Sequence, residues 1–302
     1  MNFLKLIRYK NLLMVAVVQL LIKYALFPAF AIDMTLSPLG FALLILSTVC
    51  IAAGGYIIND IYDVDTDAIN KPNKVIIGNK ISENRAYNLY FALTITGVLL
   101  GFYLSHTVNK PPFFGLFVLI AALLYIYAIY LKQIAVAGNI IVSILVSFSI
   151  IIVGIFELIP AITLSNQSIQ STMFEVLTDY AVFAFLINFV REIVKDIIDV
   201  DGDYKQGMQT LPIILGKART GKIAFTLTVI TILVIIYYIS AYLFMHYEAI
   251  VYFLIAVVGP LIYTAIKLIM AENTPQYKHV SFMLKAIMVT GMFSMLLYRF
   301  IF

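Results

Sequence analysis

Nine long apolar runs, separated by short polar stretches, dominate the pattern of this 302-residue chain. An α-helix rises about 1.5 Å per residue, so about 20 apolar residues cross a hydrocarbon layer of roughly 30 Å. Runs such as residues 140–148 do not alternate apolar and polar positions as a membrane β-strand does. The pattern therefore predicts an all-α, polytopic membrane protein whose nine transmembrane helices lie near residues 11–31, 39–59, 87–106, 113–131, 134–156, 177–198, 221–244, 248–270 and 281–301.

Composition strengthens this prediction. With 63% hydrophobic and 12% charged residues, the chain cannot form a water-soluble globular domain of its size. The net charge is only +4 and no basic face with interleaved aromatic residues is present, so we expect no nucleic-acid partner. The sequence also gives no sign of an obligatory protein partner.

The basic residues are distributed unevenly between the two sides of the predicted membrane. If the amino terminus is cytoplasmic, all Lys and Arg residues except Lys23, Lys110 and Arg299 lie on or near the cytoplasmic side. The predicted outer connection, residues 157–178, contains neither residue type. The positive-inside rule then predicts a multi-pass protein of the cell (plasma) membrane with a cytoplasmic amino terminus and an outer carboxy terminus.

The first apolar run has a second interpretation. Basic residues precede it and Ala29-Phe30-Ala31 ends it, as in a cleavable signal peptide. We favour a retained span, because the apolar stretch is long, Lys23 interrupts it, and eight further spans make cleavage unnecessary for insertion.

Half of the 16 acidic residues lie in two copies of one short motif. Residues 60–67 (Asp-Ile-Tyr-Asp-Val-Asp-Thr-Asp) and 196–203 (Asp-Ile-Ile-Asp-Val-Asp-Gly-Asp) agree at six of eight positions. Each copy follows an even-numbered span, so both are predicted to face the cytoplasm. We treat the chain as one domain, residues 1–302, with an internal pseudo-repeat of about 1–133 and 134–270 that carries the motifs at 59–67 and 196–203.

Helical spacing gathers the acids of each motif on one face, since positions i, i+3 and i+7 share a face of an α-helix. The two stripes are Asp60, Asp63 and Asp67, and Asp196, Asp199 and Asp203. Asn59 joins the first stripe, whereas Asp65 and Asp201 point elsewhere. If the stripes faced each other, their carboxylates would repel unless cations lay between them. The alternative for either motif alone is a solvated helix end beside the lipid headgroups.

Ligand chemistry narrows the choice of cation. Oxygen ligands without nearby Cys or His favour Mg2+, Mn2+ or Ca2+ over zinc or copper. Mg2+ commonly joins one or two carboxylates to the phosphates of a substrate. Two facing acidic stripes therefore predict a metal-dependent clamp for a diphosphate.

Cationic and polar side chains suited to phosphate oxygens lie near the motifs: Arg8, Lys132, Arg191 and Lys195, with Asn188 and Tyr127. Arg191 lies inside an apolar run, where an unpaired charge costs a few kcal/mol, so we expect it to pair with a carboxylate or a phosphate. Asn188 either faces a cavity or packs between helices. Tyr127 either belongs to an interfacial belt or serves the phosphate site. Arg8 and Lys132 are alternatively ordinary membrane anchors.

The motifs resemble the paired Asp-rich signatures of the UbiA-type intramembrane prenyltransferases, which have nine transmembrane helices. The first copy is residues 59–67, and the segments 69–72, 127–132 and 138–139 are also similar to family segments. Residues 191–203, with Gly207 and 210–216, are most similar to the geranylgeranylglycerol-phosphate geranylgeranyltransferase branch. Two departures are Lys74-Val75, where the family often has Arg-Pro, and Lys195, where the repeat predicts a second Asn.

The resemblance implies a bundle around a central cavity with cytoplasmic cap loops, and a Mg2+-dependent prenyltransferase. Its metal ligands would be Asn59, Asp60, Asp63, Asp67, Asp196, Asp199 and Asp203. The residues expected to act in catalysis are Asp63, Asp67, Asp199, Asp203 and Lys132. The residues expected to bind substrate are Arg8, Asn59, Tyr127, Arg191, Lys195 and Asn188. The partners would be a prenyl diphosphate donor, a lipophilic acceptor and the lipid bilayer.

Two alternatives remain at the level of sequence. The acceptor is either a glycerol-phosphate ether lipid, as the second motif suggests, or an aromatic quinone precursor. A secondary transporter or cation exchanger would also combine internal repeats with intramembrane acids. Transport sites usually lie near the midplane of the membrane, whereas both motifs here are predicted at the ends of helices.

Overall fold

The computed structural model describes residues 2–301, with all of their side chains except those of Lys74 and Ile301. Within that range nine helical segments are long and apolar enough to cross a membrane, which confirms the predicted number of spans. They are Tyr9–Ala29, Pro38–Tyr62, Glu83–Thr107, Pro111–Ile129, Ala137–Ala161, Gln167–Lys205, Lys217–Tyr242, Tyr247–Ile269 and Thr274–Phe300.

Five spans are built mainly from one α-helix each: α4 (Pro38–Tyr62), α6 (Glu83–Thr107), α8 (Ala137–Glu157), α9 (Gln167–Lys205) and α11 (Lys217–Tyr242). The others are α2 (Tyr9–Leu21) with the π-helical turn η1 (Ile22–Leu26) and α3 (Phe27–Ala29), α7 (Phe114–Ile129), α12 (Tyr247–Phe253) continued through a π-helical turn into α13 (Gly259–Ile269), and α14 (Thr274–Phe293) followed by α15 (Tyr298–Ile301). Five short elements lie outside the spans: α1 (Asn2–Leu6), α5 (Val64–Asn70), η2 (Pro72–Lys74), η4 (Leu131–Gln133) and α10 (Leu211–Leu215).

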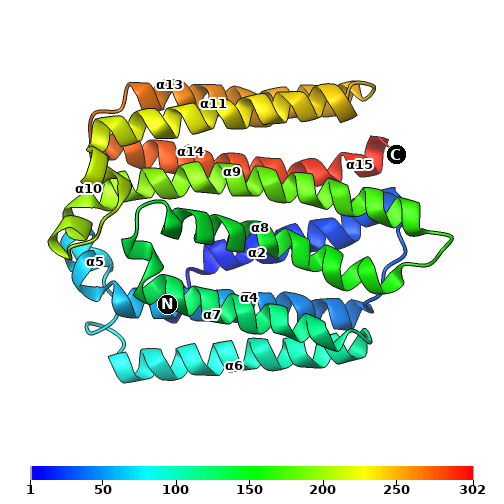
Figure 1. The fold of residues 1–302 in the computed structure, drawn as a ribbon, viewed down its shortest axis with the longest axis horizontal. Coiled ribbons are helices and arrows are strands. Elements are labelled where there is room, and N and C mark those ends of the chain that lie inside the picture. The colour runs from blue at the N-terminus through cyan, green and yellow to red at the C-terminus, as the bar shows by residue number, and fades with distance from the viewer. Residues whose placement is uncertain (1, 302) are drawn as a thin grey trace.

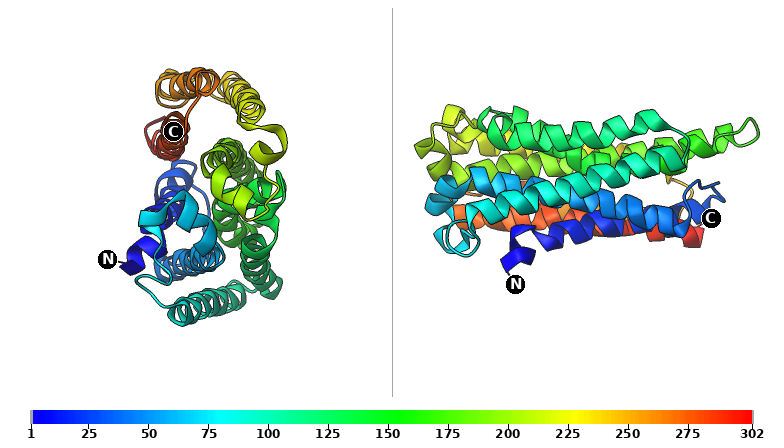
Figure 2. Two further views of the ribbon diagram at one scale, coloured as in Figure 1. Left: turned by 90° about the vertical axis from the view of Figure 1, so that its left-hand side faces the viewer. Right: turned by 90° about the horizontal axis from the view of Figure 1, so that it is seen from below.

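The long helices run side by side along the longest dimension of the molecule (Figure 1). Helices α11 and α13 form one outer layer, α6 lies on the opposite side, and α2, α8 and α9 lie between them. Helices α5 and α10 lie together at the end of the bundle that faces the viewer in the left panel of Figure 2. We call this the motif end, because both acidic motifs lie there. The first span starts near the motif end, where Arg8 contacts Asp60. Because nine spans bring the chain to the other side, the carboxy terminus lies at the opposite end (Figure 1).

The sequence specifies where helices begin. At the start of α4, the Ser37 hydroxyl accepts a hydrogen bond from the Gly40 N–H at 3.1 Å, and Pro38 occupies the first turn. At the start of α14, Asn273 and Gln276 form a reciprocal capping box. These caps satisfy backbone groups that the helix itself leaves unpaired.

Several boundaries lie outside the predicted ranges, such as Thr274 in place of 281 at the start of the last span, and two differences change the picture. Helix α9 has 39 residues and starts at Gln167, ten residues before the predicted 177, so only a short turn remains of the expected 157–178 connection. The turn is fixed by Asn166, which accepts from the Thr163 N–H at 2.7 Å and donates to Asp33 at 2.8 Å. Hydropathy missed this extension because the first turns of α9 are polar.

The second difference lies in the first acidic motif. Helix α4 ends at Tyr62, and Asp63 separates it from α5. The Asp63 N–H still donates to the backbone carbonyl of Asn59 at 2.9 Å, and the Asp67 N–H donates to the backbone carbonyl of Asp63 at 2.7 Å. The expected stripe is therefore preserved across a bend rather than along one straight helix.

A buried ion pair joins three elements far from the motif end. Lys23 of η1 donates to Glu157 at 2.5 Å and to the Leu36 carbonyl at 2.7 Å, while Glu157 accepts from the Leu36 N–H at 3.0 Å. The Lys23 and Glu157 side chains are 4% and 0% exposed. The first apolar run is thus packed inside the bundle, and its one charge is paired there.

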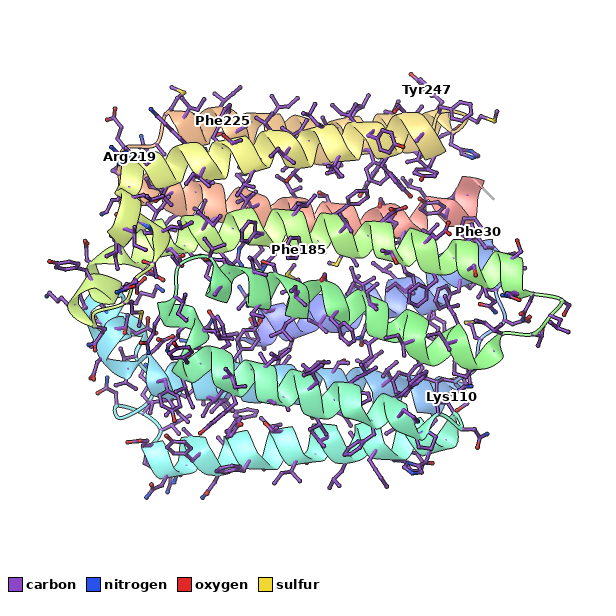
Figure 3. All side chains as sticks on the ribbon, viewed as in Figure 1. Phe30, Lys110, Phe185, Arg219, Phe225 and Tyr247 are labelled. Carbon is purple, nitrogen blue, oxygen red and sulfur yellow. The ribbon has the colours of Figure 1, made fainter. Side chains whose placement is uncertain are left out.

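Side chains cover the outside of the bundle along its whole length (Figure 3). Large apolar residues such as Phe282, Leu233 and Ile255 are more than half exposed on these faces. A water-soluble protein rarely exposes such continuous apolar surface, whereas lipid chains cover it without cost. The protein is therefore a multi-pass membrane protein.

Candidate active site

The two acidic motifs are held together by α5, which packs beside the carboxy-terminal part of α9. The Asn70 side chain donates to the Asp199 carbonyl at 2.7 Å and accepts from the Gly202 N–H at 2.8 Å. A methyl group at residue 202 would overlap the Asn70 amide, so glycine is required for this approach. Asn70 therefore fixes the register of the first motif against the second.

Lys71 joins the carboxylates of both motifs. Its ammonium lies 2.6 Å from Asp199 and 3.8 Å from Asp67. Burial raises the pKa of Asp67 above its ordinary value, and the charge of Lys71 partly offsets that rise. A cation between the motifs is thus part of the structure, and here the protein itself supplies it.

The first motif is anchored by two further cations. Lys132, in η4, donates to Asp63 at 2.5 Å, and Asn59 donates to the other oxygen of that carboxylate at 2.5 Å. Arg8 lies between α1 and α2 with a left-handed φ of 50°, which costs about 1–2 kcal/mol for a non-glycine residue. It donates to Asp60 at 2.7 Å and lies over the ring of Tyr56. Arg8 and Lys132 therefore face the acids.

The second motif lies within the continuous helix α9. Asp196 accepts a hydrogen bond from Asn139 of α8 at 2.9 Å. Asp203 is buried, lies within electrostatic reach of Asp196, Asp199 and Asp63, and has no ion-pair partner among residues 2–301. Asp201 is exposed, as is Asp65 in the first motif, so both point away from the site as predicted.

The remaining expected residues lie along α9 and α7. Lys195 binds both oxygens of Glu192, at 2.7 and 3.0 Å, so its ammonium is already paired. Arg191 makes a longer contact of 3.4 Å with the same carboxylate, and its Nε is buried without a hydrogen-bond partner. Asn188 lines a cavity and also donates weakly to Ser143 of α8 at 3.3 Å. Tyr127 lies within electrostatic reach of Glu192, Asp63 and Asp196, which places it beside the site.

The donor atoms suit a hard cation. Oxygens of Asn59 and Asp199 are buried without hydrogen-bond partners, and Asp203 is free of ion pairs in the described part of the chain. These are oxygen ligands of the kind that Mg2+ takes. However, no three acidic, histidine or cysteine side chains in residues 2–301 are grouped closely enough to hold a metal by themselves. The expected compact cluster is therefore absent from the described residues. The carboxylates of the two motifs form instead what we call the acidic mouth: Asp60, Asp63, Asp67, Asp196, Asp199 and Asp203. Protein cations partly neutralise it, and a metal bound there would take further oxygen ligands from water or phosphate.

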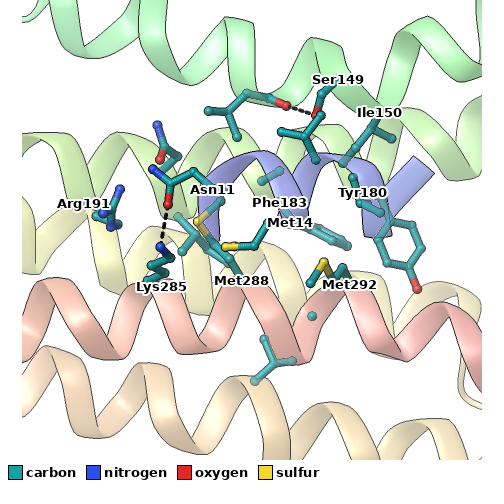
Figure 4. Close-up of a pocket in the computed structure, with 18 of the residues that line it drawn as sticks. Asn11, Met14, Ser149, Ile150, Tyr180, Phe183, Arg191, Lys285, Met288 and Met292 are labelled. Atoms are coloured by element: carbon teal, nitrogen blue, oxygen red, sulfur yellow. Dashed lines mark hydrogen bonds between the residues drawn. The ribbon is translucent and has the colours of Figure 1, made fainter. Parts of the chain in front are cut away.

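An apolar cavity of about 140 Å³ lies between α2, α8, α9 and α14 (Figure 4). Apolar residues such as Val18, Ile150 and Met292 make up most of its wall. Asn11, Arg191 and Lys285 form its polar end, and Tyr180 lies toward the other end. Since Arg191 precedes Asp196 by little more than one turn of α9, the polar end is the end nearer to the acidic mouth.

Sequence reasoning missed several polar residues of this region. Asn70 and Lys71 follow the first motif directly and belong to a segment already similar to the family, so proximity to the motif was the available signal. Asn139 follows Gly138 in another such segment. Asn11 and Lys285 are 274 residues apart, and nothing in the sequence joins them.

Sequence comparison finds relatives named digeranylgeranylglyceryl phosphate synthase. A protein called digeranylgeranylglyceryl phosphate synthase from Korarchaeum cryptofilum is 33% identical over 204 residues, which are 65% of each chain. The protein of that name from Methanosphaera stadtmanae is 31% identical over 76% of this chain and 77% of its own length. The chain thus spans slightly less than two thirds of the first of these relatives.

Solved structures share the fold. One described as digeranylgeranylglyceryl phosphate synthase in membranes has a TM-score of 0.68 and 24% identity, covering 100% of this chain and 98% of its own. A UbiA homolog from Aeropyrum pernix has a TM-score of 0.67 and 15% identity, covering 98% and 97%. A UbiA homolog from Archaeoglobus fulgidus, bound to GPP and Mg2+, has a TM-score of 0.54 and 17% identity, covering 98% and 99%.

The family model covers nearly the whole bundle. It spans residues 20–294 and so includes both acidic motifs, the bend at Asp63, and the cavity-lining parts of α8 and α9. With that match, and with the fold that it shares with the solved UbiA homologs, this chain belongs to the UbiA prenyltransferase family.

Proposed function

We propose that this protein transfers a prenyl group from an isoprenoid diphosphate to a glycerol-phosphate ether lipid in a Mg2+-dependent reaction. One observation carries the proposal: two acidic motifs from distant parts of the chain are held against each other, near one end of an apolar cavity. A polar, cation-rich mouth suits a diphosphate, and an apolar cavity suits a hydrocarbon chain. A prenyl diphosphate combines these two chemistries in one molecule.

The comparisons support this choice. The relatives above are named for making digeranylgeranylglyceryl phosphate, and the Archaeoglobus fulgidus homolog was solved with GPP and Mg2+. The oxygens of Asn59, Asp63, Asp67, Asp199 and Asp203 would hold Mg2+, with Asp60 and Asp196 nearby. When bound, the metal would neutralise charge on the diphosphate leaving group.

The protein's own cations would assist the leaving group. Lys71 contacts a carboxylate of each motif and Lys132 contacts Asp63, and both would exchange these carboxylates for phosphate oxygens. As the bond between C1 and the diphosphate oxygen breaks, its electron pair leaves with the diphosphate. The hydroxyl oxygen of the acceptor would then give an electron pair to the allylic carbon, and the hydroxyl proton would pass to the departing diphosphate. Aromatic faces such as that of Tyr127 would stabilise the positive charge on that carbon. The apolar wall would exclude water from it.

The acceptor would determine which branch of the family the protein represents. The cavity wall is predominantly hydrocarbon, which suits a lipid acceptor. An aromatic quinone precursor is the alternative, and the experiment below distinguishes the two.

We also propose that the motif end faces the cytoplasm at the plasma membrane. The support is the positive-inside rule, since the motif end carries basic residues such as Arg219, while the opposite end shows few, Lys110 among them (Figure 3). The single domain and its pseudo-repeat, 1–133 and 134–270, remain predictions, supported by the two motif copies at the same end.

The test is a transfer assay with purified protein in lipid vesicles. Geranylgeranyl diphosphate and Mg2+ are supplied with geranylgeranylglyceryl phosphate or with 4-hydroxybenzoate as acceptor. We expect product only with the lipid and only with Mg2+, and at least a hundredfold loss in Asp63→Ala and Asp199→Ala, equivalent to about 2.7 kcal/mol.

Matched controls lie in the same motifs. Asp65→Ala and Asp201→Ala remove exposed carboxylates that point away from the site, so we expect near-normal rates. Product from 4-hydroxybenzoate alone would assign the aromatic alternative. Near-normal activity of correctly folded Asp63→Ala and Asp199→Ala would refute the clamp.

A further inference from the structure

A second polar group lies at the cavity's polar end, apart from the carboxylates of the acidic mouth. Lys285 of α14 donates to the Asn11 side chain of α2 at 2.5 Å (Figure 4). Arg191 of α9 contributes to the same end of the cavity. Three helices that are distant in sequence thus place two cations and an amide around one end of the cavity.

This group has an excess of positive charge. Lys285 has no ion pair among the described residues, and it feels the repulsion of Arg191, Lys10 and Lys195. Arg191 has only the 3.4 Å contact with its neighbour Glu192, and that carboxylate is already held by Lys195 at 2.7 Å. The other cations near the motifs differ, because Arg8, Lys71 and Lys132 each have a carboxylate within 2.7 Å.

One donor of the group is left without a partner. The Nε atom of Arg191 is buried and makes no hydrogen bond. A buried donor without a partner is costly, and a positively charged one more so. An anion at the polar end of the cavity would satisfy this donor and relieve the repulsion between Arg191 and Lys285.

A chain of contacts connects this group to the acidic mouth. Asn11 interacts with the Tyr56 hydroxyl, Arg8 lies 5.1 Å from the centre of the Tyr56 ring, and Arg8 is bound to Asp60. Two ligands held at the two positions would therefore be neighbours. In the acidic mouth each of Lys71 and Lys132 is held by a carboxylate, whereas Lys285 in the cationic group has no carboxylate partner among the described residues.

We propose that Lys285, Arg191 and Asn11 bind the phosphate monoester of the acceptor lipid directly, with no metal. This inference rests on the proposed function, since it assigns the second substrate of the same reaction. It separates the two phosphorylated substrates by chemistry. The diphosphate would be held by a metal on the carboxylates together with Lys71 and Lys132, and the monophosphate by Lys285, Arg191 and Asn11 without a metal. Lys285 and Arg191 then determine specificity for a phosphorylated acceptor.

The test compares Lys285→Gln with Lys278→Gln. Both substitutions remove one positive charge from α14, but Lys278 is exposed and outside the cavity. Two readouts are taken. The first is the KM for geranylgeranylglyceryl phosphate and for geranylgeranyl diphosphate. The second is binding of geranylgeranylglyceryl phosphate, and of geranylgeranylglycerol without its phosphate, in EDTA by native mass spectrometry.

In the wild type we expect binding in EDTA and a preference for the phosphorylated lipid. Lys285→Gln should raise the acceptor KM about 10- to 100-fold, as for loss of one hydrogen bond between charged groups, and should reduce that preference similarly. The donor KM and the Lys278→Gln variant should change less than twofold. Lys285→Arg should recover part of the loss, because it restores the charge.

Failure of this inference can be distinguished from failure of the proposed function. A raised donor KM with an unchanged acceptor KM would assign Lys285 to the diphosphate, and unchanged KM values for both would remove it from substrate binding; either result overturns the inference. If the wild type transferred the prenyl group only to an aromatic acceptor, the proposed function itself would fail, whatever Lys285→Gln did.

Discussion

Lys71 gives the sharpest test of how the two motifs are held together. It lies 2.6 Å from Asp199 and 3.8 Å from Asp67, so it neutralises one carboxylate from each motif. Lys71→Met keeps most of the aliphatic side chain and removes the ammonium. Two carboxylates would then face each other without a cation between them.

The magnitude follows from the exposure of the partners. A hydrogen bond between charged groups contributes about 1.5–3 kcal/mol, and solvent weakens it. The Lys71 and Asp199 side chains are 32% and 20% exposed, so we expect a loss of about 1–2 kcal/mol. Such a loss lowers the melting temperature by about 2–8 °C.

The assay is thermal unfolding of the purified protein in detergent, in EDTA and in saturating Mg2+. We expect the full loss in EDTA and a smaller one in Mg2+, because a metal bound only by the folded state stabilises it and takes over the role of the ammonium. Lys217→Met is the control. Its contact with Asp201 is 3.8 Å long, with side chains 46% and 80% exposed, so no measurable change is expected.

Two results would refute this reasoning. An equal loss in EDTA and in Mg2+ would mean that Lys71 and the metal do not share the same carboxylates. No loss in EDTA would mean that the ion pair does not hold the motifs together.

Two further predictions concern packing. Gly202→Ala should destabilise the protein by about 1–3 kcal/mol and reduce transfer, because the new methyl group displaces Asn70. In the control Gly115→Ala the new methyl group meets no atom within 4 Å, so that variant should be neutral. Melting and transfer assays on both variants check this, and equal behaviour of the two would contradict it. Lys23→Met should cost about 3–5 kcal/mol by leaving Glu157 charged and buried. Chemical unfolding should show much of that loss recovered in Lys23→Met/Glu157→Met; a double variant as unstable as the single one would disprove the pairing argument.

Much of the fold was accessible from local sequence. The nine spans follow from the length of apolar runs, because a hydrocarbon layer of fixed thickness requires helices of a certain length. Their ends were less accurate where polar turns extend a helix beyond the apolar run, as at the start of α9. The bend at Asp63 was also missed, since the hydrogen-bonding positions on both sides of it still follow helical spacing.

The candidate site was predicted in part. The repeated motif identified the carboxylates, and the outward direction of Asp65 and Asp201 follows from helical periodicity. The partner of each acid was not predictable in the same way. Lys71, Lys132 and Asn139 reach their carboxylates across 128, 69 and 57 residues of chain.

The sequence by itself determined that the chain crosses a membrane, how many times it does so, and which acids share a face, because these properties depend on residues a few positions apart. Only the tertiary structure decided that Lys195 is held by Glu192, that Arg191 keeps an unpartnered donor, and that Lys285 meets Asn11 at the polar end of the cavity. The physical reason is that charge is balanced in space and not along the chain. A cation's role depends on which carboxylate the packing of helices brings to it.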